Sequence, residues 1–213
     1  MSRQCGYPFP VGHREQLLAA ARRLLETKGY AHITARDLVA ESDTNLASIG
    51  YHFGSKAALL NAALESAFED WSEQLAALVM ADPDATPIQR GMATWVAVIE
   101  TLPRRRPILQ SYVDALAQAQ REPELAGQLA AHYRHARAKV AALVAVSLGD
   151  GTPADDPRCM AIATFVIAVC DGLSVQWLLD PEHAPTGAEL LAGLTTVWAA
   201  SFGADVTDSV LGD

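Results

Sequence analysis

Four side chains that can donate or accept hydrogen bonds fall within one short stretch, at Asn45, Ser48, Tyr51 and His52. The apolar residues among them fit the inner face of a helix, so we interpret the four polar residues as pointing outward. Short side chains at the start of a helix let its backbone approach the edges of DNA bases, and hydroxyl groups can bind phosphates. The chemistry that this stretch indicates is recognition of nucleic acid by hydrogen bonding.

The sequence lacks the patterns that support bond-making chemistry. It has no nucleophile elbow, no metal-ligand spacing, no phosphate loop and no paired-carboxylate pattern. The cysteines Cys5, Cys159 and Cys170 form neither a CxxC pair nor a cluster with histidine. We therefore expect no enzymatic activity, no metal, no cofactor and a reducing cytoplasmic location. Cys170 is interpreted as a small buried hydrophobe, with thiol sensing as the alternative.

Three short helices are needed to position the polar stretch. The apolar spacing predicts a first helix from His13 to Lys28, which Gly29 ends. Thr34 is a good N-cap for a second helix, Ala35–Glu41, and Asn45 for a third helix through about Phe53, after a turn at residues 42–44. This is the geometry of a helix-turn-helix. Its predicted inner face consists of Leu38, Ala40, Ala47, Ile49 and Phe53.

The rest of the chain also repeats at helical spacing, and no stretch alternates apolar and polar residues for long. A fourth helix begins after Gly54 and Ser55 and continues towards Leu78. Segments containing proline separate the later ones. We predict them at Ile88–Leu102, Pro107–Arg121, Glu124–Leu148, Pro157–Leu179 and Thr186–Phe202. The expected fold is all-α, with about nine helices.

This pattern suggests two domains. The helix-turn-helix domain spans residues 13–60, with its fourth helix continuing to about residue 80. Residues 81–203 form a helical body, while residues 1–12 are an N-terminal arm and residues 204–213 an acidic tail. The tripeptide Arg104-Arg105-Arg106 lies between two prolines and is interpreted as a solvated loop, with a second phosphate-binding patch as the alternative.

Charge is distributed unevenly along the acidic chain, whose formal net charge is −9. Residues 1–60 hold seven Lys or Arg against five acidic residues, whereas the remainder holds nine against twenty. A small basic excess on one end suits a DNA-facing domain on a body that repels phosphate. The most apolar segment, Cys159–Cys170, is too short to span a bilayer and is expected to be a helix buried in protein. We expect no membrane association.

The run TARDLVAESDTNLASIGYHFGSKAALL resembles the DNA-binding signature of TetR-family transcriptional regulators. The shared features are the threonine that opens the second helix, the Arg-Asp pair after it, the YHF triplet and the F-x-S-K step into the fourth helix. Together with the end of the first helix, the match covers roughly residues 16–60. The resemblance implies a homodimer that binds a partly palindromic operator as a repressor. A small molecule in the C-terminal domain would release it.

The resemblance also assigns roles to residues of the helix-turn-helix. Thr34 and Tyr51 would bind phosphates, His52 would lie beside the DNA backbone, and Lys56 would contact phosphate as a point charge. Thr44 belongs to the same DNA-facing group. Base recognition falls to the start of the third helix, at Asn45, Leu46, Ala47 and Ser48. Two residues depart from the family pattern: Gly50 removes one groove contact, and Asp43 stands where many members have glycine in the turn.

The helical body is expected to bind the effector and to form the dimer. The words DGLSVQWLLDPE resemble the penultimate helix of one TetR branch, in which the last two helices pack against those of the partner. An apolar or amphipathic effector is expected among the middle helices. The predicted lining is Trp95, Ile99, Tyr112, Leu116, Tyr133, Phe165 and Trp177, with Gln110, Asp114 and Gln176 as polar anchors. Each of these residues could instead belong to the plain core.

Two alternatives stay open. The first keeps the helix-turn-helix but has no small-molecule inducer, so that the chain is a constitutive, protein-regulated or activating DNA binder. The second is an all-α enzyme that uses His and Asp residues of the body, and the missing catalytic patterns argue against it. Of the histidines outside the motif, His32, His132, His135 and His183 are interpreted as structural or exposed.

Overall fold

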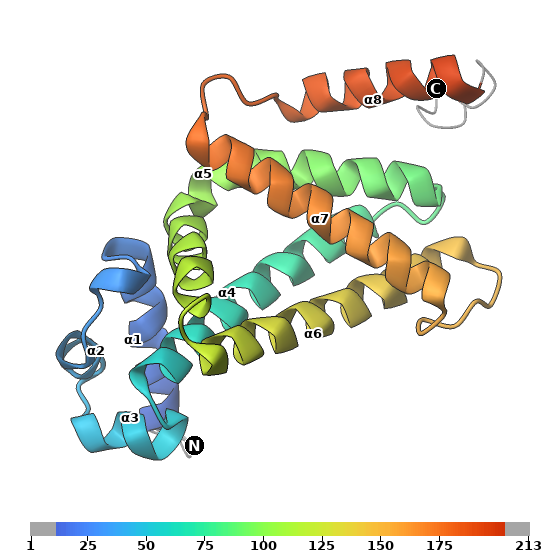
Figure 1. Ribbon diagram of the computed structural model, residues 1–213. Coiled ribbons are helices and arrows are strands. Elements are labelled where there is room, and N and C mark those ends of the chain that lie inside the picture. The colour runs from blue at the N-terminus through green and yellow to red at the C-terminus, as the bar shows by residue number, and fades with distance from the viewer. Residues whose placement is uncertain (1–11, 203–213) are drawn as a thin grey trace, which may run out of the picture.

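The computed structural model describes residues 12–202, apart from the side chains of residues 198, 199, 201 and 202. The expected arm and acidic tail therefore lie, except for Gly12, outside the described residues. Within them the chain forms eight α-helices and one short 3-10 helix, and no strand (Figure 1). The elements are α1 (His13–Thr27), η1 (Tyr30–His32), α2 (Ala35–Ser42), α3 (Leu46–Phe53), α4 (Lys56–Val79), α5 (Pro87–Ala119), α6 (Pro123–Leu148), α7 (Pro157–Leu179) and α8 (Gly187–Phe202).

We call α1, η1, α2 and α3 the head, and α5 to α8 the body; α4 runs from one into the other. Figure 1 shows α2 and α3 at one end of the molecule and α8 at the opposite end. The all-α prediction is confirmed, and the predicted helix ends in the head agree with the structure to within one residue. Local capping explains this agreement: Thr34, Asn45 and Ser55 each accept a hydrogen bond from a backbone N–H in the first turn of the following helix.

The predicted break at the LPRRRP segment is wrong. A single helix, α5, runs through it with Pro103 and Pro107 in its interior, and Figure 1 shows the helix sharply bent there. Each proline removes a backbone hydrogen bond and bends the helix, at a cost of about 3 kcal/mol. Burial of Leu102, Ile108 and Leu109 around the bend offsets this cost, because each buried side chain contributes roughly 1.5–3 kcal/mol.

The three arginines in the bend are therefore helical and do not form a loop. The guanidinium of Arg105 donates to Gln74 Oε1 at 3.0 Å and lies 5.7 Å from the ring centre of Trp71. Arg106 lies 5.9 Å from the ring centre of Trp177. These contacts hold the bend of α5 against α4 and α7.

One hydrophobic cluster joins the head to the body. It contains Leu17 and Leu25 of α1, Leu38 of α2 and Ile49 of α3, and it continues into α5 through Val98 and Leu109. The second half of α5 packs against α1 and η1, so the bend brings body residues onto the base of the head. Motion of α5 or α4 is therefore coupled to the head by direct packing.

Helices α7 and α8 leave much of their apolar surface uncovered in one chain. The prediction that α7 is buried on several faces is wrong for a single chain, because only Cys159, Ala163 and Ser174 of this helix are buried. Leu179 is 81% exposed, and Val175 and Phe165 are exposed as well. In residues 12–202, α7 is the one helix that is long and apolar enough to cross a membrane by length and composition alone, a test that core helices of soluble proteins also pass.

Candidate DNA-binding face and effector cavity

The turn between α2 and α3 depends on one residue in the left-handed conformation. Asp43 adopts φ 51° and ψ 44°, and its backbone N–H donates to Val39 O. Aspartate tolerates this conformation better than most residues, so the turn keeps its geometry without the glycine of the family pattern. Asn45 then caps α3, its Oδ1 accepting from Ser48 N at 3.0 Å.

The outward face of α3 presents few and small groups beside one large one. Tyr51 is 86% exposed and Leu46 is 55% exposed, while Asn45, Ala47 and Gly50 are exposed too. No atom lies within 4 Å of the position that a Cβ at Gly50 would occupy. The face therefore combines a protruding phenol with a small-residue surface on which a DNA base edge could come close to the backbone.

Two predictions about which side chains face inward or outward are wrong. Ser48 is only 7% exposed, and its hydroxyl donates to Asn45 Oδ1 at 3.2 Å and contacts His13 Nδ1 at 3.5 Å. It braces the start of α3 against α1. Conversely, Ala40 and Ala47 are exposed and do not belong to the inner face. A short helix crosses its neighbours obliquely, so its inner stripe is narrower than the sequence pattern indicates.

Three other predicted DNA contacts already have partners inside the head. Thr34 and Asp37 form a capping box, in which the Thr34 hydroxyl donates to Asp37 Oδ2 at 2.7 Å. The Thr44 hydroxyl lies 2.8 Å from that of Ser42. Lys56 Nζ donates to the carbonyl oxygen of Ile33 at 2.9 Å. An ammonium has three protons, so Lys56 can keep this bond and still contact a phosphate.

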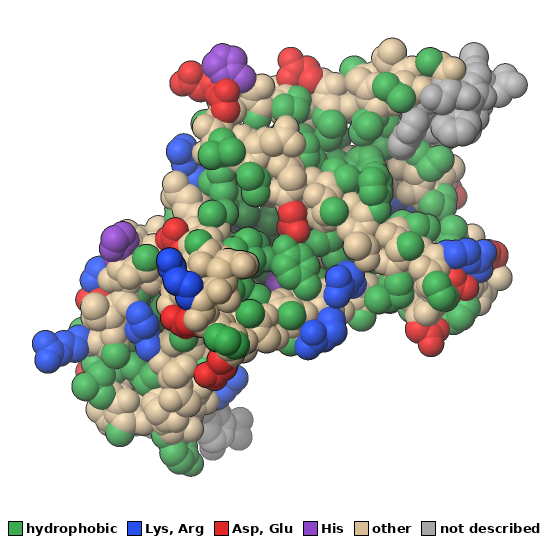
Figure 2. Space-filling model, viewed as in Figure 1, with side chains coloured by type: hydrophobic (Ala, Val, Ile, Leu, Met, Phe, Trp, Pro, Cys, Tyr) green, Lys and Arg blue, Asp and Glu red, His purple; other side chains and the backbone are tan. Residues whose placement is uncertain are grey.

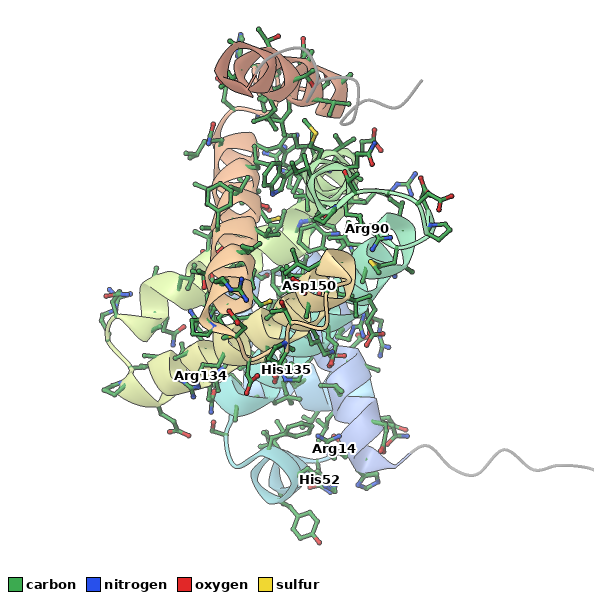
Figure 3. The ribbon with its side chains drawn as sticks, turned by 90° about the vertical axis from the view of Figure 1, so that its right-hand side faces the viewer. Arg14, His52, Arg90, Arg134, His135 and Asp150 are labelled. Carbon is green, nitrogen blue, oxygen red and sulfur yellow. The ribbon has the colours of Figure 1, made fainter. Side chains whose placement is uncertain are left out.

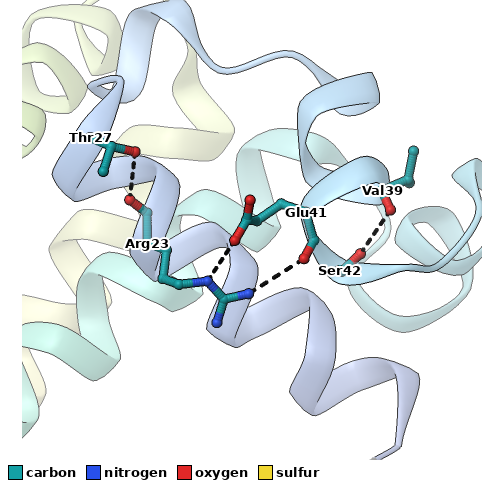
Figure 4. Close-up of polar contacts among 5 residues, drawn as sticks. All are labelled: Arg23, Thr27, Val39, Glu41 and Ser42. Atoms are coloured by element: carbon teal, nitrogen blue, oxygen red, sulfur yellow. Dashed lines mark hydrogen bonds and ion pairs between the residues drawn. The ribbon is translucent and has the colours of Figure 1, made fainter.

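Three of the six lysine and arginine side chains in residues 12–60 form ion pairs within the chain. Arg23 Nε donates to Glu41 Oε1 at 2.6 Å (Figure 4), Arg22 pairs with Asp70 at 2.7 Å, and Lys28 pairs with Asp37 at 2.7 Å. The bonds from Lys28 and Thr34 hold the pKa of Asp37 far below its usual range. These arginines and this lysine fasten α1 to α2 and α4, so half of the lysine and arginine side chains of residues 12–60 have a structural role.

Arg14, Arg36 and Lys56 are the cations of residues 12–60 that have no carboxylate partner. The guanidinium of Arg14 lies 5.3 Å from the ring centre of Phe53, and Figure 3 shows Arg14 and His52 at the same end of the head. His52 is half-buried, with its ring 4.8 Å from that of Tyr51 in an edge-on arrangement. The sequence pattern assigns no DNA contact to His13, Arg14 or Arg36, since only the folded head shows which basic groups have no carboxylate partner.

A cavity of about 400 Å³ opens among α4, α5, α6 and α7. Figure 2 shows a hollow with mainly hydrophobic walls in the middle of the body. Aromatic rings meet edge to face along its walls: the ring centres of Phe68 and Tyr112 lie 4.9 Å apart, and those of Trp95 and Phe165 lie 6.1 Å apart. A cavity of this size with mostly apolar walls and a few polar groups has the usual form of a small-molecule site.

Four of the predicted effector residues line this cavity, namely Trp95, Tyr112, Tyr133 and Phe165. The other predicted residues do not. Ile99 is buried and Leu116 is half-buried, both outside the cavity. Trp177 packs against the hydrophobic cluster that joins the head to the body, which we call the common core, and its ring lies beneath Arg106. Gln110 and Asp114 line a separate groove between the end of α1 and α5, and Gln176 is exposed. For Gln110 and Asp114 the bend in α5 explains this outcome, because it brings the second half of the helix against the end of α1.

Polar groups missed from the sequence lie in the cavity wall. The Tyr133 hydroxyl donates to Asp171 Oδ2 at 2.7 Å, and burial raises the pKa of this carboxyl. Burial also raises the pKa of Tyr112 to about 12 and lowers that of His132. Both Trp95 Nε1 and His132 Nδ1 are buried without a hydrogen-bond partner. Unpartnered buried donors and acceptors of this kind are typical of walls that meet a ligand or a water molecule.

Helix α4 belongs to the DNA-binding unit and to the cavity at once. Leu59, Leu60 and Leu64 in its first half are part of the common core, and Phe68, Trp71 and Leu75 further along line the cavity. Two hydrogen bonds meet at Asn61 of α4. The Tyr30 hydroxyl donates to Asn61 Oδ1 at 3.0 Å, and the Asn61 amide donates to Gln128 Oε1 of α6. A molecule in the cavity would therefore contact the same helix, α4, that packs against the head.

The described residues offer little else that could carry chemistry. They contain no group of three or more His, Cys, Asp or Glu that could hold a metal ion. Cys170 borders the cavity, and burial raises the pKa of its thiol to about 12. A thiol that stays protonated is a poor nucleophile, so the description of Cys170 as a small hydrophobe fits the structure better than thiol sensing.

Family models match both parts of the chain. Residues 17–63 match the model of bacterial regulatory proteins of the tetR family, and residues 87–197 match that of the C-terminal domain of BetI-type transcriptional repressors. No curated protein sequence matches the chain.

Solved structures with the same fold are similar over nearly their whole length. A regulator from Rhodococcus sp. assigned to the TetR family is 19% identical with a TM-score of 0.64, over 87% of this chain and 97% of that chain. The multidrug binding protein EbrR complexed with malachite green is 30% identical with a TM-score of 0.58, over 86% and 96%. A transcriptional regulator from Saccharomonospora viridis in complex with choline is 22% identical with a TM-score of 0.58, over 89% and 96%. The chain, with its helix-turn-helix head and its helical body, belongs to the TetR family of transcriptional regulators.

Proposed function

We propose that the chain is a cytoplasmic, homodimeric repressor that leaves a palindromic operator when a small apolar or amphipathic molecule enters the body cavity. The observation that carries this proposal is the course of α4, which packs in the head and then lines the cavity. A ligand that displaces the far half of α4 would change the separation of the two heads. Because successive major grooves are about 34–36 Å apart, a small change in that separation disfavours binding.

In this proposal the exposed residues of the head divide the work on DNA. Asn45, Leu46 and Ala47 face the bases, and Tyr51 binds phosphate through its exposed hydroxyl. Lys56 and Arg14 add positive charge beside the DNA backbone, where the ring of His52 also lies. Ser48 is not among the proposed base contacts, because its hydroxyl already contacts Asn45 and His13.

Thr34 and Thr44 keep only an indirect role in the proposal. The Thr34 hydroxyl completes the cap of α2, and the Thr44 hydroxyl is close to that of Ser42. Their backbone N–H groups and the start of α2 can still face a phosphate, as helix N-termini commonly do. Substituting either side chain would then weaken DNA binding mainly by loosening the turn.

The dimer is proposed to form through α7 and α8. Their exposed apolar residues include Phe165, Val175 and Leu179 of α7 and Val197 of α8. Figure 1 shows α8 at the end of the molecule away from α3. A four-helix contact with the same two helices of a partner would bury this surface. Structures that hold malachite green in EbrR and choline in the Saccharomonospora regulator support a ligand role for the cavity.

A binding and release experiment tests the proposal. DNA from the promoter region of the chain's own gene is labelled, and the affinity of the purified chain is measured by fluorescence anisotropy at fixed salt. Compounds that raise the melting temperature are then added, since a ligand of the native state stabilises it by mass action. A stabilising compound is expected to weaken operator binding by about tenfold or more. A compound that binds the cavity tightly and leaves operator affinity unchanged would contradict the release mechanism.

The alternative of a regulator without an inducer predicts a different result in the same experiment. No member of a broad metabolite panel would stabilise the chain, although operator binding would be intact. The unpartnered buried atoms of Trp95 and His132 favour the ligand-responsive form, because they leave hydrogen bonds for a ligand to complete.

A further inference from the structure

The cavity wall contains a carboxylate that no cation of the described residues neutralises. Asp171 on α7 has one hydrogen-bond partner, the hydroxyl of Tyr133 on α6, at 2.7 Å. No lysine or arginine within residues 12–202 forms an ion pair with it, and the neighbouring His132 is kept neutral by its burial. A partly buried negative charge without a counter-charge is costly, and a ligand can supply the missing positive group.

Apart from the carboxylate of Glu65, the other charges around the cavity are compensated or distant. Lys139 pairs with Glu69 and lies 3.7 Å from Glu73, so this cluster carries no excess positive charge. Arg90 donates to Ser147 Oγ at 3.2 Å and to the carbonyl oxygens of Asp82 and Pro83.

The hydrogen bond from Arg90 to Ser147 places the guanidinium beside α6. Tyr133, the partner of Asp171, belongs to the same helix. The two α6 residues are fourteen positions apart, which corresponds to roughly 21 Å along a helix. The cavity is therefore negative at the Asp171 end, and the positive Arg90 marks its other end.

Aromatic rings surround the negative end. Tyr133 carries the hydroxyl bound to Asp171, its ring lies 6.3 Å from that of His132, and Phe68 lies 4.9 Å from Tyr112. The faces of such rings attract cations, most strongly where water is excluded. Glu65, whose carboxylate lies 4.0 Å from His132 Nδ1, adds a second negative charge at the same end.

We propose that the effector is an organic monocation with an aromatic or apolar body, and that Asp171 holds its positive charge. The proposal rests on the proposed function in placing the effector in this cavity. The apolar body would lie along Leu75, Val140 and Val144 towards the far end, where Arg90 disfavours a second positive group. Binding would replace water at a partly buried carboxylate with an ion pair, and burial already makes that carboxylate costly to leave unpaired.

Three probes of one shape test the sign of the charge. Benzyltrimethylammonium is the cation, phenylmethanesulfonate the anion and neopentylbenzene the neutral isostere. Their dissociation constants for the full chain are measured by isothermal titration calorimetry near neutral pH. The cation is expected to bind at least about tenfold more tightly than either of the others, since a partly desolvated ion pair contributes this much or more. Equal binding of the three, preference for the anion or no binding of the cation would overturn the proposal.

Variants locate the charge. Asp171→Asn keeps the shape and an acceptor for Tyr133 but removes the charge, and it is expected to bind the cation about tenfold more weakly. The matched control, Asp155→Asn, removes a carboxylate in the exposed loop before α7 and should bind as the wild type does. Unchanged cation binding in Asp171→Asn would overturn the assignment, and its melting curve shows whether the variant is folded.

The outcomes for effector charge and for operator release are separable. If the cation binds as expected but operator affinity is unchanged, the release mechanism fails and the charge assignment stands. If a neutral or anionic compound binds the cavity and releases the operator, the proposed function stands and the monocation is wrong.

Discussion

At the scale of single residues, two tyrosines of the head have different roles because one is exposed and the other is buried. Tyr51 extends from α3 and is 86% exposed, whereas Tyr30 is buried and donates to Asn61 Oδ1 at 3.0 Å. Burial raises the pKa of Tyr30 to about 12, so its hydroxyl stays protonated as a donor. Exposure therefore separates a group available to DNA from one that holds the head to α4.

Replacing Tyr51 with phenylalanine is expected to weaken operator binding about tenfold, because a hydrogen bond to a charged phosphate is worth roughly 1.5–3 kcal/mol. The melting temperature should not change, since the hydroxyl has no partner in the described chain. Operator titration and thermal unfolding check the two parts. Tyr30→Phe is the control: it leaves Asn61 Oδ1 unpaired and should lower the free energy of unfolding by about 1–3 kcal/mol. Full operator affinity in Tyr51→Phe would refute the phosphate contact.

His132 makes stability depend on pH. Burial lowers its folded-state pKa, while Glu65, Glu69 and Asp171 oppose that shift and His135 adds to it. The unfolded chain therefore takes up a proton near its ordinary pKa of about 6.5, which the folded chain does not bind. Stability from this residue is present above that pH and decreases as the pH falls below it. Denaturant unfolding between about pH 7.5 and pH 5.5 should show a steeper loss for the wild type than for His132→Gln. Equal slopes would mean that His132 titrates normally in the folded state.

At the scale of elements, the bend of α5 makes a helix of the body serve as a cap for a helix of the head. The buried hydroxyl of Ser111 donates to the carbonyl oxygen of Leu25 at 2.9 Å, near the end of α1. The last carbonyl groups of a helix have no partner within it, so this bond satisfies one of them from another element. The two prolines that bend α5 are what bring Ser111 to that place.

Ser111→Ala should lower the free energy of unfolding by about 1–3 kcal/mol, because the Leu25 carbonyl oxygen would be buried without its donor. Urea unfolding monitored by circular dichroism measures the change. The control is Thr164→Ala on α7, where an exposed hydroxyl only bonds the carbonyl oxygen of its own helix at Met160. A loss no larger than the control's would show that α5 does not cap α1.

At the scale of the whole molecule, the proposed function depends on two copies acting together. One chain presents α3 at one end and uncovered apolar residues of α7 and α8 at the other (Figure 1). Two heads that share one palindromic site bind with the combined energy of both contacts, which a single head lacks. Dimer formation and operator affinity should therefore be lost together.

The double variant Val175→Glu with Leu179→Glu is expected to be monomeric at micromolar concentration, because the new carboxylates would be buried in the contact. Light scattering measures the mass, and operator affinity is expected to fall at least about a hundredfold. Leu78→Glu, at an exposed leucine of α4 outside the proposed contact, is the control and should be dimeric. A dimeric double variant would exclude these residues from the interface.

The sequence by itself determined the parts of this protein whose chemistry is local. Thr34 and Asn45 cap their helices as predicted, Ser55 caps the fourth helix, and Asp43 adopts the left-handed turn, because these contacts span only a few residues. Tertiary structure decided the rest. It determined that the prolines of α5 bend the helix without ending it, and that Ser48 faces inward. It also placed Asp171 in the cavity and Gln110 outside it. The side of a long helix that lines a cavity depends on packing partners that are distant in the chain. The periodicity of apolar residues within one helix does not identify those partners.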